Sequence, residues 1–169
     1  MGSTFLIVMM LMQAQPRAEP EQPLAVLSVC DVVTHDPTRR NGQVVKVRGV
    51  LAGTNEGIWL VDECPTHLVT KGLSWGNDLS VHVNAADRSI ERSWEAMLER
   101  VKQLHESVRD KVWITILGRV ETRASMDDEV VQMPYGLRRA GFGHLGEAPA
   151  EIDVILVEDV SVERRLAIK

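Results

Sequence analysis

Cysteine is scarce in this chain: two of its 169 residues are cysteines. So low a count excludes the disulfide-dense miniproteins, whose small cores depend on several cross-links. Positive charge is also short, because Lys and Arg total 19 against 24 for Asp and Glu, which gives a net charge of −5. Proteins that bind nucleic acid through bulk charge have the opposite sign, so we expect no bulk binding to DNA or RNA.

Apolar runs long enough to cross a membrane are absent. The unbroken run Phe5–Met12 has eight residues, whereas a membrane span needs about 20. Such a run is typical of the core of a secretory signal, with cleavage after Ala14, although an N-terminal strand or helix packed on the domain is the alternative. We therefore predict a signal peptide over 1–14, a Pro-rich linker over 15–23 and one domain over 24–169. This organisation places the mature protein in the periplasm or outside the cell.

Motifs of nucleophilic and phosphate chemistry are missing as well. The sequence has no Gly-x-Ser-x-Gly, no His-Glu-x-x-His and no phosphate-binding loop, which are the local patterns of common hydrolases and nucleotide-binding proteins. We therefore predict no catalytic residues, no metal and no cofactor. The chain is interpreted as a binding protein rather than an enzyme.

Apolar and polar residues alternate clearly in several segments. In Val44–Leu51 apolar residues alternate with Lys46 and Arg48, which predicts a half-buried strand. Later in the chain, apolar residues recur at helical spacing and predict one long helix over 87–109, with Asp87 as its cap. The predicted strands are Val44–Leu51, Ile58–Val61, Leu79–Val83, Val112–Val120 and Ile152–Val157.

The order of these elements predicts the fold class. Five strands with the helix between the third and the fourth follow the element order of the OB fold, a small Greek-key barrel. Gly49 and Gly118 lie within long strands and favour the strong coiling that closes a barrel. We predict a mainly β fold with one long helix, arranged as a five-stranded OB-like Greek-key barrel. An open α+β sheet and a different five-stranded barrel are the alternatives.

The two cysteines are Cys30, in a short helix predicted to begin after Ser28, and Cys64. In an exported protein two cysteines most simply form one disulfide, which here would stabilise the fold by about 3.8 kcal/mol through loop closure. Two free buried thiols are one alternative. A zinc site is another, because Cys64 and His67 are three residues apart, but zinc signatures usually repeat such a close pair.

The predicted barrel indicates where a ligand binds. OB-like barrels bind across the second and third strands and the flanking loops, where aromatic rings stack on bases or sugars. Trp59 and Trp75 fall in that region, while Arg138 supplies local positive charge. His144 stands between glycines, which let a backbone approach a ligand closely. We predict these four residues as the ligand-binding set, with an unknown envelope ligand or protein as the partner.

Structural roles are the alternative for two of these residues. Trp59 is then part of the core, and His144 fixes its own loop.

Two further functions stay open. A metal-dependent hydrolase or nuclease would use His144 with the carboxylates of Asp127–Glu129 and Asp62–Glu63. A purely structural envelope protein would bind no small ligand.

Four segments of the chain resemble a group of uncharacterised exported bacterial proteins with OB-like folds. These segments are Ser28–Val32, Asn41–Gly49, Asp62–Pro65 and Gly141–Gly146. The resemblance covers most of the mature chain and implies an exported, non-cytoplasmic setting with a paired cysteine. It implies no established activity and therefore no catalytic residues.

Overall fold

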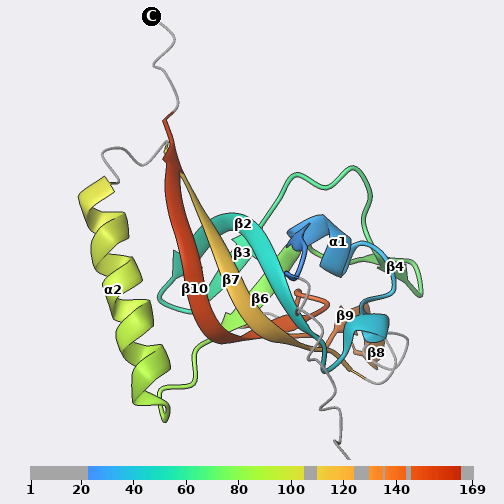
Figure 1. Ribbon diagram of the computed structural model, residues 1–169. Helices are drawn as coiled ribbons and strands as arrows, with labels where there is room; N and C mark the ends of the chain where they lie inside the picture. The colour runs from blue at the N-terminus through green and yellow to red at the C-terminus, as the bar shows by residue number, and fades with distance from the viewer. Residues whose placement is uncertain (1–22, 105–109, 124–129, 135, 144–145, 165–169) are drawn as a thin grey trace, which may run out of the picture.

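The computed structural model describes residues 23–104, 110–123, 130–134, 136–143 and 146–164 (Figure 1). The predicted signal peptide and residues 15–22 of the predicted linker lie outside these residues. So do two features of the hydrolase alternative, Asp127–Glu129 and His144.

The described chain is mainly β with one long helix, as predicted. The main sheet contains β1 (Val26–Ser28), β2 (Val44–Thr54), β3 (Gly57–Val61), β6 (Asp78–His82), β7 (Lys111–Glu121) and β10 (Glu151–Glu163). Two small sheets pair β4 (Val69–Thr70) with β5 (Leu73–Ser74) and β8 (Val130–Met133) with β9 (Gly136–Arg139). The helical segments are α1 (Val29–Val33), the 3-10 turn η1 (Pro37–Arg40) and the long helix α2 (Arg88–Leu104).

Strand pairing brings together segments that are far apart in the sequence. The hydrogen-bonded order in the main sheet is β1-β2-β3-β6-β10-β7, and β7 also pairs with β2. β6 and β10 pair in parallel, whereas β10 and β7 form a long antiparallel ladder. Helix α2 lies alongside β10, and α1, β4, β8 and β9 lie on the opposite side of the molecule (Figure 1). The end of β6 therefore lies beside the start of β10.

The structure corrects the predicted element order in two places. The main sheet has a sixth strand, β1, which pairs in parallel with β2. The small pair β4–β5 lies within a connection that the sequence pattern left irregular. Helix α2 therefore follows β6, and the prediction that it lies between strands 3 and 4 is wrong for the chain as it folds. Strands of two or three residues are too short to show an alternation, so the pattern could not reveal them.

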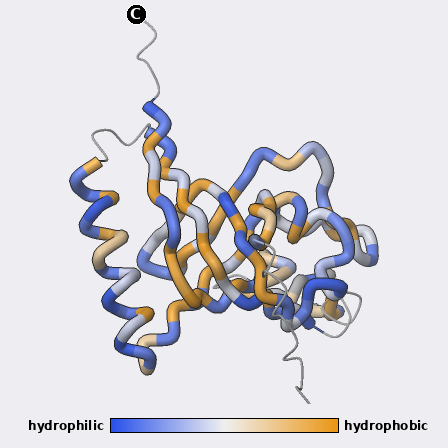
Figure 2. Tube along the Cα trace, viewed as in Figure 1, coloured by the Kyte–Doolittle hydropathy of each residue, from blue (hydrophilic) through white to orange (hydrophobic). Residues whose placement is uncertain are grey.

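The core has the residues that the alternation predicts. Val45 and Val47 in β2 are 7% and 0% exposed, and Trp94 and Met97 of α2 are also buried. The rest of α2 is mostly hydrophilic (Figure 2). Gly49 lets α1 pack directly on β2, because a Cβ at that position would lie 2.6 Å from Cγ2 of Val29. The core thus extends from the strands to α1 on one side and to α2 on the other.

A disulfide joins Cys30 in α1 to Cys64, which follows β3. The predicted pairing is confirmed, and neither cysteine is a free thiol or a zinc ligand. The bond connects α1, whose valines are buried in the core, to the long connection between β3 and β6.

Helix α1 begins with a capping box. The hydroxyl of Ser28 accepts a hydrogen bond from the backbone N–H of Asp31, and the Asp31 carboxylate accepts one from the backbone N–H of Ser28 at 2.8 Å. The backbone hydrogen bond from Ser28, and then the one from its hydroxyl, lower the pKa of Asp31 below its ordinary value of 3.8. These bonds satisfy N–H groups that the helix itself leaves unpaired.

Replacing Asp31 with asparagine should lower the free energy of unfolding at neutral pH by about 1 kcal/mol, the usual scale of a cap. A carboxyl with a lowered pKa stabilises the fold above pH 3.8, and this contribution is lost as the pH falls through the lowered value. The difference between wild type and Asp31→Asn should therefore shrink over that acidic range. Urea unfolding of both proteins at a series of pH values measures it, and a pH-independent difference would contradict the capping role.

Candidate metal centre

The parallel pairing of β6 with β10 sets which side chains share a face. Ile152 lies opposite Val81, and both are buried in the core. The residues that alternate with them face the other side of the sheet. That side therefore has Ser80 opposite Glu151, and His82 opposite Asp153.

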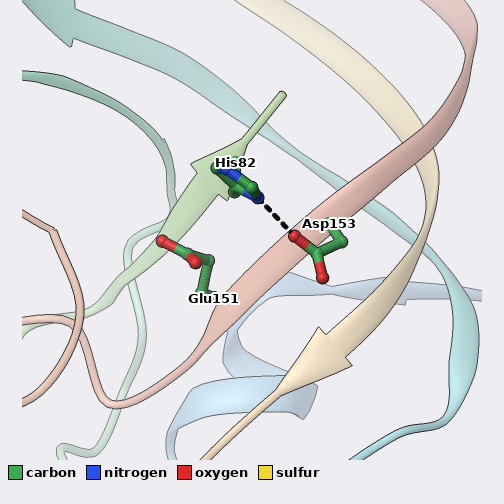
Figure 3. A group of neighbouring side chains, drawn as sticks. All are labelled: His82, Glu151 and Asp153. Carbon is green, nitrogen blue, oxygen red and sulfur yellow. Dashed lines mark hydrogen bonds and ion pairs between the residues drawn. The ribbon is translucent and has the colours of Figure 1, made fainter. Parts of the chain in front are cut away.

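Three of these side chains lie around one point. Nδ1 of His82 is 2.6 Å from Oδ1 of Asp153, and one carboxylate oxygen of Glu151 completes a group whose atoms all lie within 4.8 Å of one another. The imidazole comes from the end of β6 and both carboxylates come from the start of β10 (Figure 3). We name His82, Glu151 and Asp153 the seam cluster, because they lie across the parallel seam between these strands.

Ser80 fixes the orientation of one carboxylate. Its hydroxyl donates a hydrogen bond of 2.9 Å to Oε2 of Glu151, and Ser80 itself is 4% exposed. A buried hydroxyl with this geometry limits the rotation of the glutamate side chain. Hydrogen bonds of this kind commonly orient metal ligands in proteins.

The seam cluster is accessible to solvent. The side chains of His82 and Asp153 are 56% and 40% exposed. One imidazole nitrogen with carboxylate oxygens is a donor set that first-row divalent metals accept. Ligand atoms around one such ion lie about 3–3.5 Å apart, a spacing that small rotations of exposed side chains can reach. Water can complete the coordination from the open side.

The charges around the seam cluster are mixed, because Arg119 on β7 lies directly opposite Asp153 on the same face. Among the residues that the structure describes, no lysine or arginine forms an ion pair with Glu151 or Asp153. The ionic partner of Asp153 is His82, which is charged only when it is protonated. With the imidazole neutral, the cluster has two negative charges on adjacent positions of one face.

The structure describes three of the four residues predicted to bind a ligand, and these three do not share one exposed surface. Trp59 on β3 is half-buried and pairs in register with Ser80, so it lies on the same face as the seam cluster. Trp75 is 1% exposed and packs with Val130 in a second small core, so it presents almost no surface to a ligand. Arg138 is exposed on β9, and His144 lies outside the described residues.

Backbone from the late connection covers part of Trp59. A Cβ at Gly143 would lie 2.9 Å from Nε1 of Trp59, and one at Gly141 would lie 2.6 Å from the ring of Trp75. Glycine is therefore required for this close approach. The segment that the sequence singled out for its glycines lies against both tryptophans.

The described carboxylates of the hydrolase alternative lie at the other end of β6. The backbone N–H of Asp62 donates to the carbonyl of Asn77, just before β6 begins, whereas His82 ends that strand. Glu63 forms an ion pair of 2.8 Å with Lys111. Asp62 and Glu63 therefore do not join the seam cluster.

Sequence reasoning missed the seam cluster. The alternation over Leu79–Val83 does place His82 on the polar face of its strand. The sequence pattern has no information on the parallel register that sets His82 opposite Asp153, because the two residues are 71 positions apart. Glu151 also fell just outside the last predicted strand.

Comparison of the chain with protein-family models, with curated proteins and with solved structures found no match. Within the described part of the chain, no helix has both the length and the apolar character needed to cross a membrane.

Proposed function

We propose that this chain is an exported, non-catalytic module with an OB-like barrel that binds a divalent cation at the seam cluster. The observation on which this proposal rests is the convergence of one imidazole and two carboxylates within 4.8 Å. The lack of a lysine or arginine ion pair to Glu151 or Asp153 in the described chain also supports it, because a divalent cation would neutralise both carboxylates. Mn²⁺ and Zn²⁺ are the ions that suit such a mixed nitrogen and oxygen donor set.

Two further observations support the OB-like barrel and the export. The pairing order returns from β7 to β2, which is what closure of a sheet requires. The disulfide is typical of proteins that fold in an oxidising compartment. The predicted signal peptide over 1–14 agrees with this setting. In this proposal the unknown envelope ligand is the divalent cation.

A metal-dependent hydrolase is the second candidate function. One observation favours it: three protein ligands leave coordination positions open, as in hydrolytic zinc sites, where bound water is activated. Hydrolysis of phosphodiester or ester substrates by the metal-loaded protein, but not by the metal-free protein, would establish it. The binding module that we propose should show no such turnover.

The test of the proposed function is a titration of the tag-free, disulfide-bonded protein. After treatment with a chelator and removal of the chelator, isothermal titration calorimetry with MnCl2 or ZnCl2 should show saturable binding of one ion per chain. The affinity should fall as the pH is lowered, because metal ligands must be deprotonated. Absence of saturable binding by both ions would refute the proposal.

A further inference from the structure

The strand next to the seam cluster has a third carboxylate on the same face. β10 pairs antiparallel with β7, and the residue directly opposite Glu151 is Glu121, the last residue of β7. Residues that are directly opposite in such a ladder point to the same side of the sheet. Ser80, Glu151 and Glu121 therefore form one row across three strands.

This row places two like charges opposite each other. Directly opposed like charges destabilise an antiparallel pair. Within the described chain, neither Glu121 nor Glu151 forms an ion pair with a lysine or arginine. Arg119 lies on the same face two residues earlier, directly opposite Asp153, and its guanidinium donates to the carbonyl oxygen of Gly42, two residues before β2 begins. In the described chain the two glutamates therefore face each other without an ion pair to a lysine or arginine.

Building on the proposed function, we infer that Glu121 is a fourth protein ligand of the cation bound at the seam cluster. Opposed Cβ atoms lie about 4.5–5.5 Å apart, and a glutamate side chain has three rotatable bonds. The carboxylate of Glu121 can therefore turn toward an ion that Glu151 binds, although it stands outside the compact group of three. The cation replaces the missing positive charge between the two glutamates.

A fourth ligand from β7 changes both the chemistry and the mechanics of the site. The donor set becomes three carboxylates and one imidazole, which shifts preference toward the oxygen-preferring ion Mn²⁺. The ion also joins three strands, β6, β10 and β7. The parallel seam between β6 and β10 has three residue pairs, whereas β10 and β7 pair along eleven residues. The cation thus cross-links the short seam to the longest ladder of the sheet.

The experiment compares Mn²⁺ binding by the full-length disulfide-bonded wild type with that of Glu121→Gln. Loss of the carboxylate should weaken the affinity at least about tenfold, since even residues that only orient metal ligands have effects of about 10–100-fold. It should also open one coordination position, so the number of water molecules on Mn²⁺, measured by proton relaxation dispersion, should rise by one. Glu99→Gln on the exposed side of α2 makes the same charge change and is the matched control.

Each outcome of this comparison has a distinct meaning. If wild type does not bind Mn²⁺, the proposed function itself fails. If wild type binds and Glu121→Gln has the same affinity and hydration, the assignment of Glu121 is overturned while the seam cluster stands. A weaker affinity with unchanged hydration also overturns it, because the carboxylate then acts through charge alone. Circular dichroism of each variant tests for misfolding. Glu121→Asp keeps the charge but shortens the reach of the carboxylate, so the assignment predicts reduced affinity for this correctly folded variant as well.

Discussion

Replacing His82 with glutamine should weaken Mn²⁺ binding by more than about 100-fold, which corresponds to about 2.7 kcal/mol. His82 supplies the nitrogen ligand of the seam cluster, and its Nδ1 is 2.6 Å from the carboxylate of Asp153. Glutamine keeps a polar side chain of similar length but is a poor metal ligand. Because the His82 side chain is 56% exposed, the substitution should change the free energy of unfolding little. Calorimetric titration of the metal-free proteins measures the loss.

The matched control for this substitution is His35→Gln. His35 is also an exposed histidine, but it follows α1 and its ring contacts the hydroxyl of Thr34. This variant should bind Mn²⁺ like the wild type, with one ion per chain. Full affinity in His82→Gln, or an equal loss in both variants, would show that the ion binds elsewhere.

Removing the disulfide should lower the free energy of unfolding, and by more than the substitution of His82 does. The double variant Cys30→Ala/Cys64→Ala should lose about 3–4 kcal/mol of unfolding free energy, because the bond closes a long loop in the unfolded chain. In the folded state it connects α1 to the connection between β3 and β6, so its loss also frees that connection. Urea unfolding monitored by circular dichroism gives the difference directly.

The same double variant separates stability from binding. The seam cluster lies at the end of β6, whereas Cys64 precedes that strand. Below its melting temperature the variant should therefore bind Mn²⁺ with the affinity of the wild type. A difference in unfolding free energy below about 1 kcal/mol would contradict the loop-closure account of the disulfide.

The parts of the fold that were predictable depend on local patterns. The alternation in β2 and the helical spacing in α2 both identify side chains that are buried in the structure, such as Val47 and Trp94. Asp87 caps α2 as predicted, since its carboxylate accepts hydrogen bonds from the N–H groups of Ser89 and Ile90. A helix or strand that is buried on one side has apolar residues at regular spacing, and these elements are long enough for the spacing to be recognised.

The parts that were not predictable depend on contacts between distant residues. β1 has three residues, and its place beside β2 follows from pairing rather than from its own pattern. Trp75 is buried because the connection around it folds onto Val130 as a second small core, which no local period reveals. A tryptophan in an apparently irregular segment therefore looked accessible when it is not.

The seam cluster was likewise predictable only in part, namely where it depends on a local pattern. Alternation predicts that His82 faces away from the core, and the structure agrees. The partners of His82 depend on a parallel register that pairs it with a residue 71 positions later, and a single sequence has no record of that register. Isolated histidines and carboxylates are common on protein surfaces, so no local pattern singles out these three as a group.

The measurement that tests the metal centre most directly is anomalous diffraction from crystals of the full chain equilibrated with Mn²⁺. Data collected at the manganese absorption edge should show a peak within bonding distance of Nδ1 of His82 and of the carboxylates of Glu151 and Asp153. A peak at any other place on the chain, or none at a saturating Mn²⁺ concentration, would contradict the proposal that this protein binds a cation across the seam between β6 and β10.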